Sequence, residues 1–217
     1  KEDIYYHCFN LFDKIGPSRF KRLLTYFGSI KKAWEGDAGE LEKAGLEKEI
    51  VKEIIEKRKD IILEQEQEKL TQENIALITW RDENYPKLLK EIYDPPPVLY
   101  CRGDFLKQDE FSLAVVGSRR ASYYGLSCAE KFSYQLSALG ITIVSGLARG
   151  IDTQAHKGAL KAGGRTIAVL GNGLNRIYPP ENKGIAEEIA GSGAVVSEFP
   201  MNTAPQAQNF PRRNRVI

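Results

Sequence analysis

Apolar residues recur three and four positions apart through the first third of the chain, which is the spacing of helices with one buried face. Glycine turns at Gly28 and Gly45 separate these stretches. Helices are predicted over residues 4–12, 19–27, 29–34 and 47–70. Two helix–turn–helix units in tandem indicate a small all-α domain over residues 1–70, of the helix-hairpin-helix or SAM-like kind. Such turns can hold a DNA phosphate through backbone N–H groups, although the same pattern also builds a structural or protein-binding scaffold.

An Asp-Pro-Pro-Pro run at residues 94–97 follows a short strand predicted over residues 75–79. The run continues as Val98, Leu99 and Tyr100. Consecutive prolines impose a stiff, extended path without N–H donors. Residues 94–100 are therefore predicted to form a strap over the surface and not a central strand, and a proline-rich ligand for a partner is the alternative.

From residue 112 onward, short apolar and β-branched runs alternate with helical stretches. The predicted strands cover residues 112–116, 141–144, 166–170 and 194–197, and the predicted helices cover residues 124–139, 152–161 and 182–190. This alternation indicates parallel βαβ units. Residues 71–217 are therefore predicted to form an extended Rossmann-like parallel sheet, and the fold class is α/β. A last helix is predicted to begin near Arg213, and the lack of closing strands after it predicts a truncated domain.

Composition places the chain among globular proteins, with 42% hydrophobic and 28% charged residues. No apolar run approaches the roughly 18 residues that a membrane span needs, and the first residues lack a signal-peptide pattern. The chain is therefore predicted to be cytoplasmic and to bind no membrane. The three cysteines, Cys8, Cys101 and Cys128, lie far apart, which fits neither a disulfide framework nor a zinc site.

Charge is unevenly distributed along a chain whose formal net charge is +2. Residues 1–75 and 76–116 each carry a net charge of −2, whereas residues 117–217 carry +6. Eight of the 12 basic residues in that last part are arginines. Because arginine recognises phosphates through paired, planar hydrogen bonds, the excess favours a phosphate-binding role over an ordinary solvated basic face.

Four short strings in the second half carry most of the candidate chemistry, and three of them combine glycine or proline with arginine. The strings cover residues 115–120, 145–152, 170–173 and 210–215. The first three each follow a predicted strand, at the edge where open α/β sheets bind ligands. Glycine lets the backbone approach a phosphate closely, and arginine forks match its oxygens. The sequence therefore predicts a phosphate-rich ligand at this edge.

No string matches the dinucleotide fingerprint G-x-G-x-x-G, and no phosphate-binding loop of the G-x-x-x-x-G-K-[ST] type is present. NAD binding and ATP hydrolysis of the P-loop kind are therefore not supported, and no cofactor is predicted. Asp152 is predicted to cap the helix that begins at Thr153. His156 lies one turn later, but no nucleophile or metal ligand is partnered with it, so no catalytic or metal-binding residue is assigned.

Phe210 stands among arginines near the end of the sequence, in the string Phe-Pro-Arg-Arg-Asn-Arg. An aromatic ring beside guanidinium groups suits a single strand of nucleic acid, because a base stacks on the ring for roughly 1–3 kcal/mol while the arginines hold the backbone. From this string alone, an ordinary core position for Phe210 is the alternative.

In their order and spacing, these strings resemble the DNA-processing protein A family (DprA, also called Smf). The resemblance begins at about residue 75 and also includes Tyr85-Pro86, Gly103-Asp104, Ala155-His156, Tyr178-Pro179 and Ser197-Glu198. It implies an extended Rossmann-like domain that binds single-stranded DNA, protects incoming DNA, and assists loading of the recombinase RecA in natural transformation and recombination. It also implies a homodimer formed through that domain, and a protein that is not an enzyme.

The resemblance carries residue roles over to this sequence as well. It implies that Arg119 is the main phosphate-binding arginine with Arg120 beside it, and that Phe210 is the base-stacking aromatic. The full set of implied DNA-binding residues is Gly117, Ser118, Arg119, Arg120, Gly146, Arg149, Phe210, Arg213, Asn214 and Arg215. Some relatives place a lysine a few residues before the aromatic, whereas residues 205–208 hold none here.

A different function is found in the same Rossmann-like superfamily, whose nucleoside-monophosphate phosphoribohydrolases cleave a base from ribose phosphate. Those enzymes carry a Pro-Gly-Gly-x-Gly-Thr string with a glutamate shortly after it, and no such string occurs in this sequence. A regulatory scaffold that acts through the helical part is a third hypothesis, and it is compatible with DNA binding.

Overall fold

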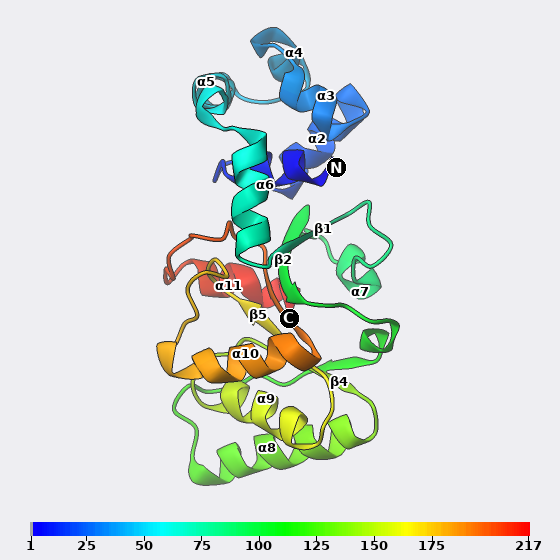
Figure 1. Cartoon of the computed structure of the whole chain (residues 1–217), viewed down its shortest axis with the longest axis vertical. Coiled ribbons are helices and arrows are strands. Elements are labelled where there is room, and N and C mark those ends of the chain that lie inside the picture. Colours follow the sequence, from blue (N-terminus) through cyan, green and yellow to red (C-terminus); the bar gives the residue numbers. More distant parts are fainter. Residues whose placement is uncertain (1) are drawn as a thin grey trace.

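A group of short helices forms one end of an elongated molecule, and an α/β part forms the other (Figure 1). The computed structural model describes residues 2–217. The first six α-helices, together called the helical module, are α1 (Asp3–Asn10), α2 (Pro17–Phe27), α3 (Ile30–Glu35), α4 (Ala38–Lys43), α5 (Lys48–Lys57) and α6 (Leu63–Gln72). The predicted all-α beginning of the chain is therefore confirmed.

The helix predicted over residues 47–70 is wrong, because the structure breaks it into α5 and α6. A 3₁₀ turn, η1 (Arg58–Asp60), follows α5, and Ile62 then takes an extended backbone conformation. The Arg58 guanidinium donates hydrogen bonds to the carbonyls of Trp34 and Gly36, both at 2.7 Å. This contact with the end of α3 holds the bend, and the bend directs α6 toward the sheet.

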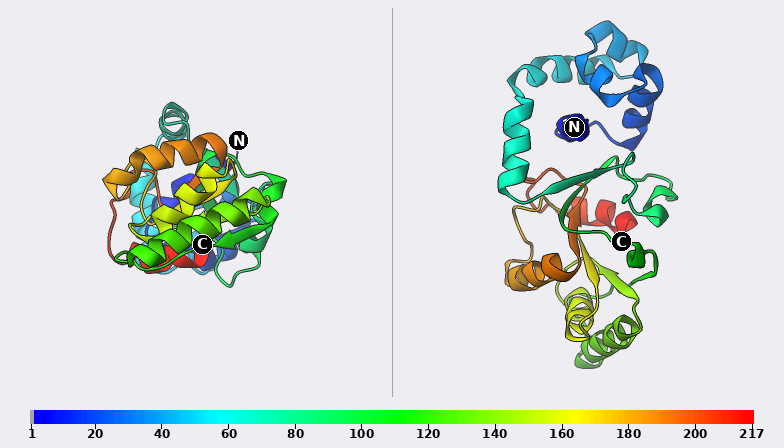
Figure 2. Two further views of the ribbon diagram at one scale, coloured as in Figure 1. Left: turned by 90° about the horizontal axis from the view of Figure 1, so that it is seen from below. Right: turned by 45° about the vertical axis from the view of Figure 1, so that its right-hand side comes forward.

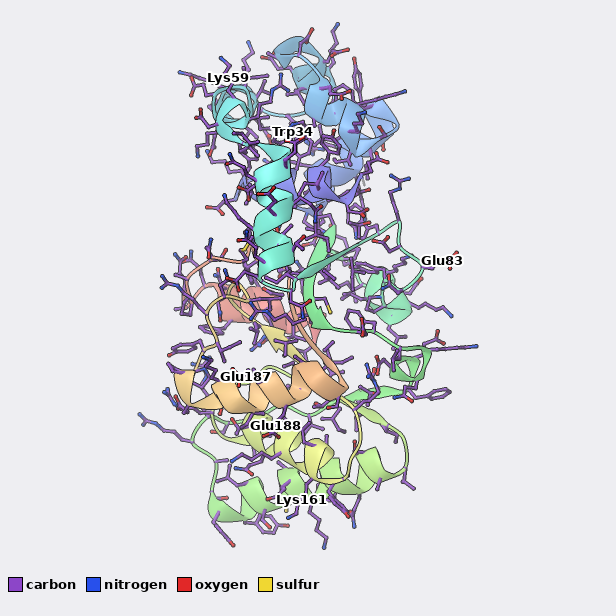
Figure 3. The ribbon with its side chains drawn as sticks, viewed as in Figure 1. Trp34, Lys59, Glu83, Lys161, Glu187 and Glu188 are labelled. Carbon is purple, nitrogen blue, oxygen red and sulfur yellow. The ribbon has the colours of Figure 1, made fainter. Side chains whose placement is uncertain are left out.

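Aromatic side chains fill the core of the helical module. The Phe9 and Trp34 rings meet edge to face with centroids 5.1 Å apart, and both side chains are buried (Figure 3 labels Trp34). Full burial of side chains of this size stabilises a fold by about 1.5–3 kcal/mol each. Gly28 ends α2 with φ +75°, and Ser29 caps α3 by accepting a hydrogen bond from the Lys32 N–H. Local capping and a shared apolar core therefore fix these short helices together.

Six strands form one mixed sheet in the order β1-β2-β6-β5-β4-β3. They are β1 (Ala76–Thr79), β2 (Val98–Gly103), β3 (Ser112–Ala114), β4 (Thr142–Ser145), β5 (Thr166–Leu170) and β6 (Ala194–Ser197). Strands β3 to β6 are parallel, whereas β2 is antiparallel to both β1 and β6. The predicted α/β class and the parallel βαβ units are confirmed, with an antiparallel pair added at one side.

The strap predicted over residues 94–100 is wrong from Val98 onward, because Val98–Gly103 forms the inner strand β2. Tyr100 pairs with Ser197 of β6 and with Leu77 of β1, and Pro95, Pro96 and Pro97 are themselves buried. The prolines end just before the strand begins, so they remove no hydrogen bond from the ladder. The continuous apolar run that follows them is typical of a strand covered on both faces.

Helices cover both faces of the sheet (Figure 2). On one face lie α8 (Tyr123–Ala138), α9 (Ile151–Lys161) and α10 (Lys183–Ser192), and on the other lie α7 (Lys87–Lys90) and α11 (Asn209–Arg213). Helix α11 begins at Asn209 and not near Arg213, because Pro211 fits within the first turn of a helix. Glu187 and Glu188 lie on the exposed side of α10 in Figure 3. Within residues 2–217, no helix is long and apolar enough to cross a membrane.

A buried polar network joins the helical module to the sheet. The Tyr100 hydroxyl lies 2.8 Å from His7 Nδ1, and His7 Nε2 lies 3.1 Å from a Glu66 carboxylate oxygen. The Asn10 amide donates to the Tyr100 hydroxyl and to the Glu198 carbonyl. The apolar core also continues from the module into the sheet. The module is therefore packed against the sheet and does not hang on a free linker.

Candidate functional site

The loops that follow three parallel strands meet at one edge of the sheet. The loop after β3 begins at Val115, whose N–H bonds the Val144 carbonyl of β4 at 3.0 Å. The loop after β4 contains Gly146, and the loop after β5 contains Gly171. This is the edge at which the sequence predicts a ligand, and we call the surface that these loops form with α11 the sheet-edge site.

Asp152 fastens two of these loops together. Its Oδ1 accepts the Gly117 N–H at 3.3 Å and its Oδ2 accepts the Gly146 N–H at 3.2 Å. Burial raises the pKa of this carboxyl group, while the backbone hydrogen bonds and Arg213 oppose that shift. The prediction that Asp152 caps its own helix is wrong, since Gly150 occupies the N-cap position without a side-chain cap. The carboxylate binds N–H groups of two neighbouring loops instead.

Gly150 lets the loop that carries Arg119 lie directly on the start of α9. A Cβ at this position would stand 2.2 Å from the Ser118 carbonyl oxygen and 3.0 Å from the Arg119 Cα, and φ is +80°. The Ile151 N–H donates to the same Ser118 carbonyl at 3.3 Å. Gly117 lies against the Ile151 side chain, because a Cβ built at Gly117 would stand 2.7 Å from Ile151 Cγ1. The backbone path at the sheet edge therefore depends on glycine at these two positions.

Arg119 lies over the ring of Phe210. The guanidinium carbon is 5.0 Å from the ring centroid, and Arg119 forms no ion pair with any residue between 2 and 217. Phe210 is half-buried, and its ring rests where Gly171 leaves space, since a Cβ there would be 2.8 Å from Phe210 Cδ1. The Tyr178 ring lies beside it, with centroids 5.9 Å apart. A free cation and a partly exposed aromatic surface are thus held together.

A basic groove of about 420 Å³ extends from Arg119 along α9. Arg120, Arg149 and Lys157 line it with Arg119. Arg149 binds Glu181 through Nε at 2.5 Å, and both side chains are half exposed. Sequence analysis did not select Lys157, although its position seven residues after Gly150 places it on the same helix face. Helical spacing from the glycine turn is the signal that identifies it.

Arg213 lies behind this surface, whereas its neighbour Asn214 is exposed. Arg213 is only 4% exposed, and its Nη1 donates to the carbonyls of Gly146, at 2.8 Å, and of Val169. Asn214 Oδ1 accepts from Arg213 Nε at 3.3 Å. Burial lowers the pKa of Arg213, while nearby Asp152 opposes this shift. Gly146 makes room for the guanidinium, because a Cβ there would lie 2.5 Å from it.

Arg215 lies in the 3₁₀ turn η4 (Asn214–Val216) that follows α11, where acidic residues hold it. It binds the buried Glu198 carboxylate and the Asp94 carbonyl, and Arg212 binds the same carboxylate at 3.1 Å. Burial raises the pKa of Glu198, and the two arginines oppose that shift. Of the basic residues that the sequence selects, Arg149 and Arg215 are held in ion pairs and Arg213 is buried, whereas Arg119 and Arg120 form no ion pair within residues 2–217.

His156 lies inside the fold and not in the groove. Its Nδ1 is 2.7 Å from the Thr166 hydroxyl, which itself donates to the Ile143 carbonyl. Burial, aided by nearby Arg213, lowers the pKa of His156 to about 3, so the ring is neutral near pH 7. In the part of the chain that the structure describes, no group of three or more His, Cys, Asp or Glu side chains could hold a metal ion.

Comparison with known proteins gives a consistent result. The sequence model of the family described as DNA recombination-mediator protein A matches residues 76–217. The chain is 39% identical to the protein Smf of Synechocystis sp., over 100% of this chain and 56% of that protein. The X-ray structure of DNA processing protein A from Streptococcus pneumoniae superposes with a TM-score of 0.80 and 33% identity, over 98% of this chain and 73% of that one.

A second solved structure is DNA processing protein A from Helicobacter pylori, described for its single-stranded DNA binding mode. It superposes with a TM-score of 0.58 and 33% identity, over 65% of this chain and 64% of that one. The chain spans about half the length of the curated relatives it matches.

Proposed function

The chain belongs to the DNA recombination-mediator protein A family, and on this premise we propose that its sheet-edge site binds single-stranded DNA. The observation that carries the proposal is the free guanidinium of Arg119 over the partly exposed ring of Phe210. A phosphate binds the guanidinium, and the neighbouring base stacks on the ring. Paired bases in a duplex are not available for such stacking, so the site favours a single strand.

The remaining residues of the site divide into those that touch the strand and those that support it. Arg120 and Lys157 continue the line of free cations along the groove and contact further phosphates. Arg149 exchanges Glu181 for a phosphate, because a half-exposed ion pair contributes only about 0–1 kcal/mol. Gly117, Ser118 and Gly146 shape the backbone. Buried Arg213 and ion-paired Arg215 hold the surface from behind, and the exposed Asn214 accepts a hydrogen bond from Arg213.

We propose that the protein acts by binding and not by catalysis. The charged residues that line the groove are cations except for Glu181, which Arg149 holds in an ion pair. We also propose that it works in the cytoplasm, protects incoming single strands and helps to load RecA in natural transformation. A homodimer formed through the Rossmann-like domain is part of the same proposal. The rate of RecA filament growth on a single strand that this protein already covers measures RecA loading. Sedimentation equilibrium measures whether the protein is a dimer.

Fluorescence anisotropy of a labelled single strand tests the DNA-binding proposal. The wild-type chain is titrated over a salt series, beside Arg119→Ala, Phe210→Ala and the control Lys161→Ala. Lys161 carries the same charge as the arginine but lies near the end of α9 and pairs with Glu130 (Figure 3). We expect Arg119→Ala to reduce the salt slope by about 0.7, the value of one phosphate contact to a single strand. Phe210→Ala leaves the slope unchanged and weakens binding by roughly 1–3 kcal/mol.

Three results would contradict this proposal. A folded chain without saturable binding to single strands overturns it, and nucleotide cleavage by the phosphoribohydrolase route is then the activity to measure. Equal affinity for a duplex of the same sequence overturns the preference for unpaired bases. If Lys161→Ala and Arg119→Ala lose the same affinity for the single strand, binding depends on total charge and not on the sheet-edge site.

A further inference from the structure

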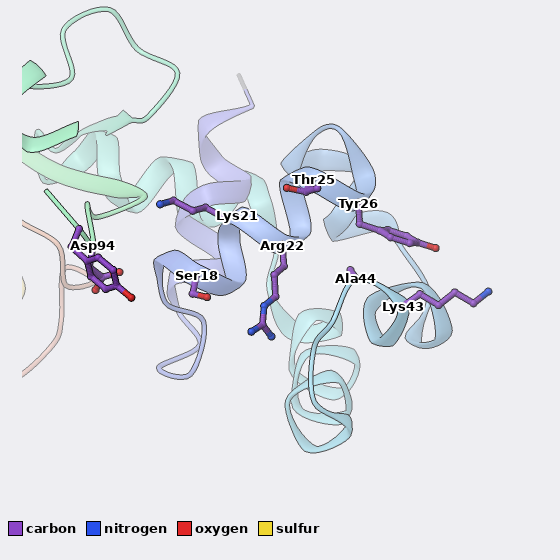
Figure 4. A pocket seen from close by; sticks show the side chains of 9 residues that line it. Ser18, Lys21, Arg22, Thr25, Tyr26, Lys43, Ala44 and Asp94 are labelled. Carbon is purple, nitrogen blue, oxygen red and sulfur yellow. The ribbon is translucent and has the colours of Figure 1, made fainter. Parts of the chain in front are cut away.

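We propose that a second groove, beside α2 in the helical module, binds another segment of the same single strand. This inference rests on the proposed function of the sheet-edge site. The groove has a volume of about 760 Å³ and lies where the helical module faces the segment before β2. Figure 4 shows Lys21 directed from α2 toward the Asp94 side of the groove, with Arg22 beside it. We call it the α2 groove.

Helix α2 presents a polar face to this groove. Its buried face carries Phe20 and Leu23, which belong to the core of the module. The opposite face carries Ser18, Lys21, Arg22 and Thr25. These four residues follow the three- and four-residue spacing of a single helix face. Two hydroxyls and two cations on one face are groups that commonly bind phosphate oxygens of nucleic acids.

The cations of the α2 groove lie in a part of the sequence whose net charge is negative, since residues 1–75 carry −2. Elsewhere in the module lysines lie beside glutamates, as in the exposed pairs Lys31–Glu35 and Lys52–Glu56. Lys21, Arg22 and Lys43 form no ion pair within residues 2–217. The nearby Asp94 carboxylate faces Arg215 instead, at 3.8 Å. The Lys21 ammonium lies over the Trp80 ring, 5.9 Å from its centroid, and the Arg22 guanidinium donates to the Gly45 carbonyl, with Glu47 close enough for the two charges to interact. A polyanion that enters the groove therefore meets cations that form no ion pair within residues 2–217.

Two exposed aromatic rings stand at the same groove. Tyr93 is fully exposed and Tyr26 is 46% exposed, and both line the groove with the cations. The Tyr26 ring packs edge to face against Phe27, with centroids 4.8 Å apart, whereas the fully exposed Tyr93 ring favours a ligand with flat faces of its own. Cations that follow a backbone and rings on which bases stack are the combination that sequence-independent single-strand sites use. We therefore infer a single strand and not a duplex.

Contacts along α11 connect the two sites. Arg212 follows Phe210 by two residues on this helix and binds Glu198. Glu198 binds Arg215, and Arg215 donates to the Asp94 carbonyl at the border of the α2 groove. Arg212 is itself exposed. A strand that leaves Phe210 thus passes a further cation before it reaches the second groove, and a long strand engages both sites where a short one engages only the first.

Anisotropy with strands of two lengths tests this proposal. Oligothymidine of about 6 nucleotides lies within the roughly 4–16 nucleotides of one site, and oligothymidine of about 30 nucleotides exceeds it. The test variant is Lys21→Gln with Lys43→Gln. The matched control is Lys31→Gln with Lys52→Gln, which removes the same charge from exposed ion pairs of the module. We expect the test pair to weaken binding of the long strand on the order of tenfold and to lower its salt slope by about 1.4.

The short strand should bind the test pair as tightly as it binds the wild type. Tyr93→Ala should weaken only the long strand, by about fivefold or more, without a change in salt slope. The α2 groove is not a second site if both double lysine variants lower the affinity for the long strand equally. The same holds if neither lowers it while Arg119→Ala still lowers the affinity for both strands. In both cases the proposed function of the sheet-edge site stands. If a duplex competes as well as the long single strand does, the groove binds backbone charge alone and this proposal is wrong.

Discussion

Arg119 and Arg213 lie close enough for their charges to oppose each other, yet only Arg119 faces solvent. Gly146 leaves space for the Arg213 guanidinium. Two backbone carbonyls accept hydrogen bonds from its Nη1, and Asn214 accepts from its Nε. A buried guanidinium without such partners would cost several kcal/mol. Arg213 therefore stiffens the floor of the sheet-edge site, while the exposed Arg119 keeps its charge for a ligand.

Sequence analysis selected these residues as candidates but did not predict the separate environments of Arg119 and Arg213. Arg213 takes its carbonyl partner from Gly146, 67 residues earlier in the chain, and no local spacing indicates that contact. Asp152 was misassigned for the same reason, since its true partners lie on two other loops. Glycine and arginine types predict a phosphate site, whereas burial of a particular side chain follows only from packing.

At the residue scale, Gly150→Ala tests how strictly the Arg119 loop depends on its glycine. The added Cβ would lie 2.2 Å from the Ser118 carbonyl oxygen, at a positive φ, so the loop must move. We expect a loss of about 1–3 kcal/mol in the free energy of unfolding, measured with urea, and a larger loss of single-strand affinity than in Gly163→Ala.

Gly163 is the matched control because its φ is also positive, at +68°, but no atom lies within 4 Å of a Cβ built there. Gly163→Ala should cost about 1 kcal/mol of stability and leave DNA affinity unchanged. Equal DNA affinities for the two variants would mean that the close approach of Gly150 to Ser118 does not position Arg119.

At the scale of elements, regular periodicity predicted α8, α9 and α10 close to their observed bounds, because each alternates with a buried strand. Prediction failed where two local signals disagreed. The prolines at residues 95–97 concealed β2, although the apolar run after them had the composition of a buried strand. The Glu- and Lys-rich run that includes α5 and α6 gave no sign of a break, because most of its residues suit a helix. The break is held by hydrogen bonds from Arg58 to the Trp34 and Gly36 carbonyls, which lie outside the run.

Removal of the Arg58 side chain tests what holds that break. Arg58→Ala deletes the two 2.7 Å hydrogen bonds to the end of α3, and we expect a loss of about 2 kcal/mol in the free energy of unfolding. The control Arg19→Ala deletes a more exposed ion pair with Glu47 and should cost less than about 1 kcal/mol. Denaturant unfolding of both variants measures the difference. A cost for Arg58→Ala no larger than that of the control would show that the bend is set by the chain itself.

At the scale of the whole molecule, the helical module and the sheet share one apolar core and one polar network. The network has a single consistent set of donors. Since the Glu66 carboxylate accepts from His7 Nε2, the neutral ring accepts at Nδ1 from the Tyr100 hydroxyl, which in turn accepts from Asn10. Burial lowers the pKa of His7, which favours this neutral form. The two parts are therefore fixed in one orientation, as a strand that touches both of them requires.

Tyr100→Phe tests whether this junction makes the molecule a single cooperative unit. The change keeps the ring but leaves His7 Nδ1 buried without its donor, so we expect a loss of about 1–3 kcal/mol in global stability. Native-state hydrogen exchange then separates two cases, because amides in α2 and in β5 report on the module and on the sheet. If both sets lose the same protection, they open together, and the junction couples the α2 groove to the sheet-edge site. A loss of protection confined to α2 would show that the module opens independently of the sheet. A loss of stability no greater than that of the exposed control Tyr134→Phe would show the same. In either case a bound strand, and not the fold, must align the two sites.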